Sequence, residues 1–447
     1  MIVVGAGAAG LTCAYRLRQA GVRCEVFEAS PRIGGRMFSD TKTFPGLVAE
    51  LGGELIDTGH ENLRTLAQEL GLQLDDLKEA EAGLRPIYDF GGRTYEESEI
   101  AAALRPLAPI VAKEIEKLGD PDVPYKAEGF FRERDQWSIS RWLREFAPDA
   151  LSRNLLSLAF TTELGLEPDE LSCITMLQML SLGDTFALYG ESDERFHIRG
   201  GNGRVPEELG KRLDGQVSVG LSLEAASRRS DGRIVLSFRK DSGVQERVAD
   251  RVVFALPFTM LRNVELSTTL GISNRKHRSI QELGYGTNAK LMLGYATRTW
   301  QQGKRSGEVF SDRSFQSSWD TTRAQAGEVG ILTVFTGGVR GATLGQGSSE
   351  FHRDACADAL DSVLSGSRAQ LLPAHARFDW PNQPFTRGSY STWKVGQLTA
   401  FGGVESEVES GILHFAGEHT SLAAQGYMEG AIESGNRVAE EILRAQT

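Results

Sequence analysis

Near its start the chain carries GAGAAG, residues 5–10, between the apolar run IVV and a segment with helical periodicity. Glycines in this spacing permit a tight turn, a close approach of backbone to a pyrophosphate, and close packing of a helix on a strand. A helix is predicted from about Ala8 to Gln19, and a second strand follows it and ends at Glu28. That acid stands near the spacing of about 20 residues at which a carboxylate accepts hydrogen bonds from a ribose. The opening of the chain therefore predicts a βαβ unit of a parallel sheet that binds a dinucleotide.

A second glycine pair follows Glu28 closely and is flanked by arginines. In SPRIGGRM, residues 30–37, Gly34 and Gly35 let backbone lie against a bulky ligand, and Arg36 supplies a positive charge for a phosphate. On these grounds alone the ligand is either a nicotinamide or a flavin dinucleotide.

With these residues the sequence resembles the flavin amine oxidase family. EASPRIGGR, residues 28–36, fits the EAxxRxGGR pattern that follows the glycine fingerprint in two-dinucleotide flavoproteins. Further segments resemble that family at ELGGELID (50–57), VVFALP (252–257) and HFAGEHTSLAAQGYMEGAIESGNRVAEEIL (414–443). Because these segments come from both ends and the middle, the resemblance covers essentially the whole chain.

The resemblance implies FAD as the cofactor. Ser389 stands where family members with covalently bound flavin carry cysteine, so the FAD is expected to be non-covalent. A helix starting near Met428 is expected to point its positive N-terminus at the flavin ring. The cofactor-binding residues implied by the resemblance are Gly5, Gly7, Ala8, Ala9, Gly10, Glu28, Ala29, Arg32, Gly34, Gly35, Arg36, Gly52, Gly53, Glu54, Leu223, Pro257, Trp380, Gly417, Glu418, Gly426, Tyr427, Met428 and Ala431.

The expected fold class is α/β, with a discontinuous two-dinucleotide-binding Rossmann-like FAD domain, a mixed α+β substrate domain and a helical subdomain. The length of 447 residues allows two or three cores. The FAD-binding domain is expected over 1–75, 200–262 and 405–447, where nucleotide-binding patterns occur. The helical part of the substrate domain is expected over 76–199 and its β-sheet part over 263–404.

Local patterns predict several elements outside the glycine loops. Residues 60–80 and 99–118 are predicted to be helical. A β-hairpin is predicted around Asp231-Gly232, a dipeptide typical of tight turns between strands.

Charge and cysteine content exclude several classes of function. A formal net charge of -11 argues against nucleic acid as a partner, because phosphate binding requires concentrated lysine and arginine. The four cysteines have neither metal-site nor disulfide spacing, so no metal is expected. No apolar run approaches the roughly 20 residues that span a bilayer, and the chain opens directly on a strand. A cytoplasmic protein without a membrane anchor, with a homodimer as one option, is therefore expected.

TNAKLMLGY, residues 287–295, is predicted to be a half-buried strand with a lysine in its middle. Ala289, Leu291 and Leu293 alternate onto one face, which places Lys290 on the other. A lysine on an edge strand commonly extends its ammonium into water. The resemblance gives Lys290 a different role, because the corresponding family strand carries a lysine that reaches toward flavin N5 through an ordered water.

Two tyrosines and an acid are the remaining catalytic candidates. By resemblance, Tyr390 and Tyr427 occupy the aromatic positions that enclose the substrate nitrogen in monoamine oxidases, although core packing is the commoner fate of any one tyrosine. Asp57 stands where some polyamine oxidases carry an acid. A ligand ammonium would stabilise such a buried carboxylate, and a hydrogen-bonded loop acid without a ligand is the equal alternative.

These residues predict an FAD-dependent amine oxidase that yields an imine, its hydrolysis products and hydrogen peroxide, with a cationic amine or polyamine as substrate and dioxygen as acceptor. The first alternative is an L-amino-acid oxidase, with basic amino acids favoured. Its carboxylate would need a cation, and Leu55 stands where several such enzymes carry arginine, which leaves Arg195, Arg199 or Arg387 for that role. The alternative from another class is a non-catalytic flavoprotein binding module.

Overall fold

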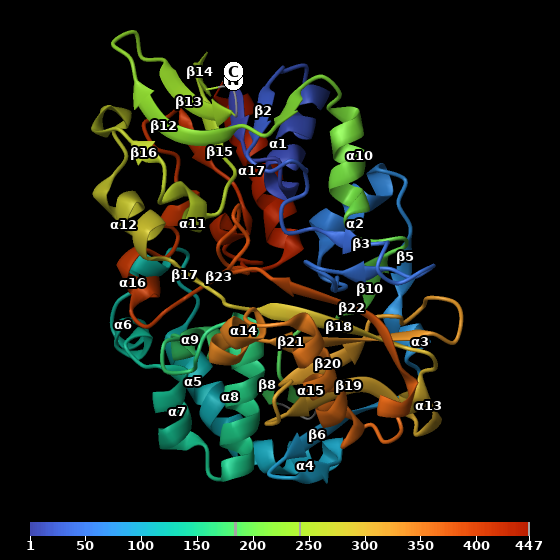
Figure 1. The fold of residues 1–447 in the computed structure, drawn as a ribbon. Helices are drawn as coiled ribbons and strands as arrows, with labels where there is room; N and C mark the ends of the chain where they lie inside the picture. Colours follow the sequence, from blue (N-terminus) through green and yellow to red (C-terminus); the bar gives the residue numbers. More distant parts are fainter. Residues whose placement is uncertain (183–185, 241–242, 446–447) are drawn as a thin grey trace.

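The computed structural model describes residues 1–182, 186–240 and 243–445, and its first layer is a five-stranded parallel sheet (Figure 1). Short buried strands from both ends of the chain pair in register, with Ile2 opposite Glu25 on one side and Val252 on the other. The strand order is β11 (Val217–Val219), β2 (Glu25–Glu28), β1 (Ile2–Val4), β15 (Val252–Phe254) and β24 (Leu413–Phe415). The nucleotide-binding patterns of both chain ends therefore meet in one sheet.

Two helices from opposite ends of the chain cover this sheet side by side. Helix α1 (Ala8–Gln19) has the bounds that the sequence predicts, and α17 (Met428–Arg444) starts at the predicted residue. They approach so closely at Gly435 that a Cβ there would lie 2.5 Å from the carbonyl oxygen of Ala9. Helix α10 (Arg204–Arg212) also packs against α1.

The second layer is a seven-stranded mixed sheet that lies below the first in Figure 1. Its order is β22 (Leu371–Asp379), β18 (Ala289–Tyr295), β21 (Gly330–Thr336), β20 (Ser317–Asp320), β19 (Arg305–Ser311), β6 (Arg85–Phe90) and β7 (Arg93–Tyr95). Strand β18 has a hydrogen-bonded neighbour on each side, so it is an inner strand.

The expectation that this strand is half-buried was wrong, because all seven residues of β18 are buried. Leu291 and Leu293 pack into one apolar core, as the alternation predicts. Met292, on the other face, packs into a separate core with Phe44 and Leu47. Coverage of the second face by the segment around residue 44 is what the alternation could not reveal.

Helices surround the second sheet. Their bounds are α4 (Glu97–Leu104), α5 (Ala108–Leu118), α6 (Phe130–Asp135), α7 (Ile139–Phe146), α8 (Ala150–Leu164), α9 (Cys173–Met179), α14 (Gly338–Leu344) and α15 (Ser349–Asp361). Helix α8 reaches the sheet through β6, β19 and β21, and it ends at Gly165 in the left-handed conformation.

The continuous helix expected over 60–80 was wrong. Helix α2 covers Glu61–Glu69, and Gly71, with φ of 76°, turns the chain into strand β5 (Leu74–Asp76). Strand β5 pairs with β10 (Phe196–Ile198), and Asp76 then caps the short helix α3 (Leu77–Ala80). Pairing with a strand far along the sequence decided this structure, which local periodicity does not register.

The predicted hairpin is present in a separate four-stranded sheet. Strands β12 (Ser222–Arg228) and β13 (Ile234–Lys240) are antiparallel, and the Asp231-Gly232 turn connects them. Strands β14 (Gly243–Ala249) and β16 (Glu265–Leu266) complete the sheet. Across the residues that the structure describes, no helix is long and apolar enough to cross a membrane.

Candidate active site

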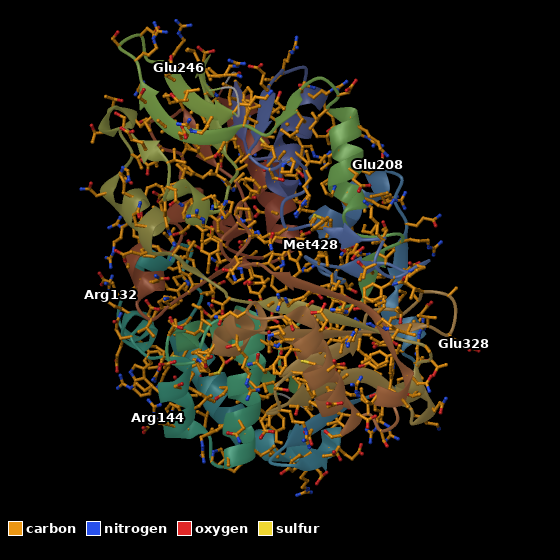
Figure 2. All side chains as sticks on the ribbon, in the orientation of Figure 1. Arg132, Arg144, Glu208, Glu246, Glu328 and Met428 are labelled. Carbon is orange, nitrogen blue, oxygen red and sulfur yellow. The ribbon has the colours of Figure 1, made fainter. Side chains whose placement is uncertain are left out.

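A cavity of about 1720 Å³ connects the glycine loops of the parallel sheet with the second sheet and the end of α8. All the predicted cofactor-binding residues except Gly10 line it, as do the four catalytic candidates Lys290, Tyr390, Tyr427 and Asp57. Met428, at the start of α17, lines the cavity and is labelled near the middle of the view in Figure 2. The candidate site is assembled from segments distant in sequence.

The glycine loop has the shape that a dinucleotide requires. A Cβ on Gly10 would lie 2.0 Å from the carbonyl oxygen of Gly5, so Gly10 lies beneath the cavity and packs helix on strand. A Cβ on Gly7 would meet nothing within 4 Å, so open space lies above that residue. Gly7 also precedes α1 without any side-chain cap, which leaves the first N–H groups of the helix free for an anion.

Glu28 lies beside this loop and is held by backbone donors. Its two carboxylate oxygens accept hydrogen bonds from the N–H groups of Ala6, at 2.7 Å, and Ser30, at 2.8 Å. Burial raises the pKa of Glu28, and these hydrogen bonds oppose that shift. The carboxyl also lines the cavity, where it is available to a ribose.

An ion pair joins the N-terminal and C-terminal glycine segments. Arg36 donates through Nη1 to Glu418 Oε1 and to the carbonyl oxygen of Ser389, both at 2.7 Å. Glu418 also accepts hydrogen bonds from the Ser391 hydroxyl and the Gly426 N–H. Burial opposes ionisation of Glu418, but Arg36 and these donors hold its pKa below the usual value. Arg36 therefore fixes the walls of the cavity through Glu418.

His419 supplies a further sign that this part of the cavity takes a polar ligand. It is buried against Phe258, with ring centroids 4.4 Å apart, and neither ring nitrogen has a partner among the described residues. Burial lowers the pKa of His419 to about 3, so the ring is neutral at physiological pH. An orphaned buried imidazole, the uncapped helix and the space above Gly7 together fit FAD.

Lys290 uses all of its donors on one neighbouring segment. Its Nζ donates to the carbonyl oxygens of Glu50, at 3.1 Å, and Gly52, at 2.9 Å, and to Glu54 Oε2, at 2.8 Å. An ammonium has three N–H groups, so none remains for the water that the resemblance implies. In this structure Lys290 positions residues 50–54, which line the cavity.

Glu54 is fully engaged in the same network. Its Oε1 accepts hydrogen bonds from Trp319 Nε1, at 2.8 Å, and the Thr321 hydroxyl, at 2.9 Å. Burial raises the cost of its charge, yet Lys290 and these donors hold the pKa of Glu54 below its usual value. The two side chains are buried, with Nζ and Oε2 2.8 Å apart, so each depends on the other.

The two candidate tyrosines converge on one residue of α8, Glu163. Tyr427 donates to Glu163 Oε1 at 2.8 Å, and Tyr390 donates to the Glu163 carbonyl oxygen at 2.5 Å. Burial is the largest cause of a raised Glu163 pKa, and the nearby Asp57 carboxylate raises it further. Glu163 lines the cavity, so a carboxyl group lies directly beside the tyrosine pair.

Asp57 is tied to a neighbouring loop. Its Oδ1 accepts hydrogen bonds from the Ser192 hydroxyl, at 3.0 Å, and the Glu194 N–H, at 2.7 Å. Its Oδ2 lies 3.2 Å from His60 Nε2. These contacts favour the hydrogen-bonded alternative over a direct role in binding a cation.

Among the acids that line the cavity and that sequence reasoning missed, Glu163, Glu194 and Glu308 have a raised pKa. Burial raises the pKa of each, and that of Glu194 reaches about 8. Glu163 and Glu308 stand alone in apolar runs, AFTTELG and SGEVF, which is a usable signal for a buried acid. The surroundings of Glu194 in the sequence, GESDERF, give no such signal.

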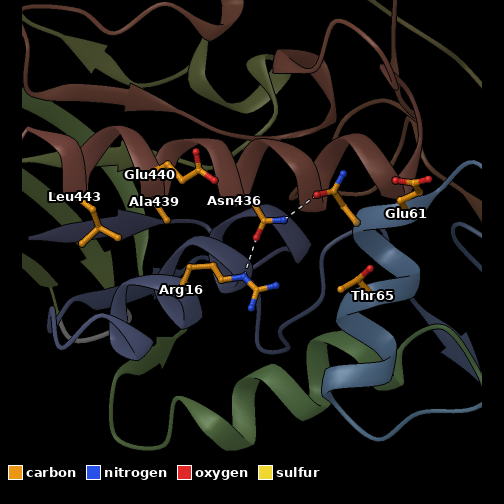
Figure 3. Close-up of a pocket in the computed structure, with 8 residues that line it drawn as sticks. Arg16, Glu61, Thr65, Asn436, Ala439, Glu440 and Leu443 are labelled. Atoms are coloured by element: carbon orange, nitrogen blue, oxygen red, sulfur yellow. Dashed lines mark hydrogen bonds between the residues drawn. The ribbon is translucent and has the colours of Figure 1, made fainter.

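A second cavity, of about 520 Å³, lies between α1, α2 and α17 (Figure 3). Arg16 is its main charged residue, and its donors are occupied by Asn436, at 2.9 Å, and Glu69, at 2.6 Å. Asn436 accepts the hydrogen bond from Arg16, and its amide group donates to Asn62. In this cleft the donors of Arg16 and the amide of Asn436 are therefore already engaged by other side chains of the protein.

Comparison with known proteins identifies relatives across the whole chain. A family model described as flavin containing amine oxidoreductase matches residues 8–443. A probable flavin-containing monoamine oxidase A of Dictyostelium discoideum is 24% identical over 99% of this chain and 97% of its own length.

Solved structures of amine oxidases have the same fold. A putrescine oxidase bound to putrescine superposes with a TM-score of 0.85 at 22% identity, over 99% of this chain and 98% of that one. Cyclohexylamine oxidase from Brevibacterium oxydans IH-35A gives a TM-score of 0.86 at 20% identity, over 100% of this chain and 98% of that one. The predicted fold class, enzyme class and FAD cofactor are confirmed, and the domain boundaries and site residues stay predictions.

Substitution of two glycines separates folding from cofactor binding. Gly10→Ala is expected to cost about 1–3 kcal/mol of unfolding free energy, because its Cβ would overlap the backbone of Gly5. Gly7→Ala is expected to leave the stability of the apoprotein unchanged but to weaken FAD binding, because its Cβ enters only the open space. Thermal unfolding of apoprotein and titration with FAD measure the two effects. Equal FAD affinity in Gly7→Ala and wild type would contradict the placement of the cofactor.

Removal of Lys290 tests its positioning role. Lys290→Met is expected to lower the free energy of unfolding by about 3–5 kcal/mol, because Glu54 is left as an uncompensated buried charge. The double variant Lys290→Met/Glu54→Gln is expected to regain part of that loss. Urea titration of the FAD-loaded proteins measures both, and full stability of the single variant would show that the ion pair is not needed.

Glu194 is expected to make stability depend on pH. Its folded pKa of about 8 lies above the unfolded value of about 4.3, so its contribution to stability is lost as pH rises between these values. Glu194→Gln cannot ionise, so its melting temperature relative to wild type is expected to rise from pH 5 to pH 8. The exposed Glu328→Gln serves as the control for removal of one charge. Parallel profiles for wild type and Glu194→Gln would refute the burial of this carboxyl.

Proposed function

Because the chain belongs to the flavin-containing amine oxidoreductase family, we propose that it oxidises a cationic amine or polyamine. The observation that carries this proposal is the set of acids in the cavity. Glu163, Glu194 and Glu308 all line it, and none of their side chains is paired with a lysine or arginine in the described residues. Burial raises the pKa of all three carboxyls, and an ammonium group bound beside them favours their ionised form, so the cavity complements ammonium groups and disfavours anions.

When bound, FAD supplies the two-electron acceptor for this oxidation. The overall reaction that we propose converts an amine, dioxygen and water into an aldehyde, ammonia or a smaller amine, and hydrogen peroxide. The flavin is held non-covalently, since Ser389 offers a hydroxyl that donates to Asn288 Oδ1 at 2.6 Å.

The residues of the chain contribute binding and orientation. Tyr390 and Tyr427 present aromatic faces that stabilise a passing ammonium, and their hydroxyls are held by Glu163. The Glu163 carboxyl then attracts the reacting amine toward the tyrosine pair. Lys290 and Glu54 hold the segment beside them, so that the amine and the cofactor meet in one geometry.

Oxidation of basic L-amino acids is the second candidate, and it needs a cation for the α-carboxylate. The arginines named for this role are engaged outside the cavity: Arg195 lies 2.7 Å from Asp76, Arg199 lies 2.6 Å from Asp75, and Arg387 contacts Asn263. Arg323 does line the cavity; its Nη1 pairs with Glu81 at 3.2 Å, and its Nε and Nη2 have no hydrogen-bond partner among the described residues. The contacts of Arg195, Arg199 and Arg387 favour an amine without a carboxylate, and Arg323 is the residue that a carboxylate would use.

An anaerobic stopped-flow screen tests the proposal. FAD-loaded protein is mixed with putrescine, spermidine, benzylamine, tyramine or each L-amino acid, and bleaching of the oxidised flavin band is recorded. Amines with two positive charges are expected to bleach it fastest, because the acids stabilise them in the cavity. Bleaching by basic amino acids alone would establish the second candidate, and no bleaching by any compound would refute amine oxidation.

A further inference from the structure

The loop around Glu194 is fastened to the segment that carries Asp57. Thr58 donates its N–H and hydroxyl to the two oxygens of Asp193, at 2.8 and 2.6 Å. Asp57 Oδ1 accepts from Ser192 and from the Glu194 N–H. Two residues after Glu194, Phe196 exchanges backbone hydrogen bonds of 2.7 and 2.9 Å with Ile56. The position of Glu194 is therefore determined from both sides.

The backbone of Glu194 adopts a conformation that needs such support. Its φ is 47°, in the left-handed region that residues with a side chain seldom occupy. The hydrogen bond from its N–H to Asp57 holds it there. In this backbone conformation the Glu194 residue lines the cavity.

The side-chain carboxyl of Glu194 has no hydrogen-bond or ion-pair partner among the described residues. This side chain is half-buried and lines the cavity. A partly desolvated carboxyl without a donor is costly, so a ligand that donates is its natural complement.

Glu308, on β19, faces the same part of the cavity. Its side chain also lacks a hydrogen-bond or ion-pair partner in the described ranges. After burial, the charge of Glu308 is the largest cause of the raised pKa of Glu194. Arg323 interacts with both, but Glu81 is the carboxylate that it pairs with. Glu194 and Glu308 are therefore both available to bind a further cation.

We propose that Glu194 and Glu308 form a subsite for a second ammonium group of the substrate, and that Asp57 is the positioning residue that aims Glu194 into it. This proposal rests on the proposed amine oxidation and narrows its substrates to diamines and longer polyamines. Glu163 and the tyrosine pair take the reacting amine, and the subsite takes the other end of the molecule.

A primary ammonium fits this subsite better than other cations. Its three N–H groups can donate to both carboxyls at once, which a tertiary or quaternary amine cannot do. A divalent metal is a poor alternative, since no group of three or more acidic, histidine or cysteine residues is arranged for one in the described residues. The other charged groups that face Glu194 are Asp57, Glu163 and Arg323, and none of them neutralises it.

Matched amines test the subsite. We would compare kcat/KM for 1,4-diaminobutane and n-butylamine, which differ only in the second nitrogen. Glu194→Gln and Glu308→Gln are each expected to lower the diamine-to-monoamine ratio about ten-fold, because each removes one charge-assisted hydrogen bond. Glu328→Gln, an exposed acid at the edge of the molecule in Figure 2, is the matched control and is expected to leave the ratio unchanged.

Two substitutions of Asp57 separate positioning from direct charge attraction. Asp57→Asn keeps the Oδ1 acceptor for Ser192 and Glu194, so it is expected to keep the diamine-to-monoamine ratio. Asp57→Ala releases the loop and is expected to lower the ratio as Glu194→Gln does, through KM for the diamine rather than kcat for the monoamine. An equal loss in Asp57→Asn would show that Asp57 acts through its own charge.

The outcomes distinguish this subsite from amine oxidation itself. An unchanged ratio in both Glu194→Gln and Glu308→Gln would overturn the subsite while amine oxidation stands. If the wild-type protein oxidises no amine, anaerobic isothermal titration with the same two compounds still reports whether the second nitrogen adds affinity that Glu194→Gln removes. Equal affinity for both compounds would then overturn the subsite as well.

Discussion

The buried Lys290–Glu54 ion pair connects the two layers of the protein at the point where they share a cavity. Lys290 projects from an inner strand of the second sheet, and Glu54 lies in the glycine segment beside the first. Neither charge is tolerable alone at this depth, so each holds the other's element in place. The cavity keeps its shape because movement of one layer relative to the other would break the ion pair and leave a buried charge without its partner.

The two ends of the cavity differ in the charged groups that line them. At the end beside the glycine loop, the first N–H groups of α1 have no side-chain cap, and Arg36 is paired with Glu418. At the other end, acids outnumber the cations that pair with them, so protons or ammonium groups must complete the balance. A molecule that carries positive charge at both ends satisfies the second region without disturbing the first.

The sequence predicted those parts of the molecule in which neighbouring residues determine the outcome. The bounds of α1, the start of α17 and the Asp231-Gly232 hairpin follow from glycine placement and local periodicity. Strand β5 was missed, because its partner β10 lies more than a hundred residues away.

In the candidate site, too, contacts between segments distant in sequence could not be predicted. The sequence singles out Lys290, whose catalytic role stays a prediction, but its partner Glu54 becomes visible only when β18 is packed against residues 50–54. Glu194 could not be found at all, since its place in the cavity depends on a backbone conformation imposed by Asp57. The resemblance pointed to the glycine segments and to the tyrosine pair, whereas Glu163, Glu194 and Glu308 required the structure.

The division of the nucleotide site between the two ends of the chain has a consequence for biosynthesis. Strand β24 and helix α17 leave the ribosome after the other strands of the parallel sheet and α1, so nascent chains expose one edge of that sheet and one side of α1 until these two segments emerge. Cofactor capture must then be a late event, and until it occurs the emerging polypeptide is a natural client for chaperones.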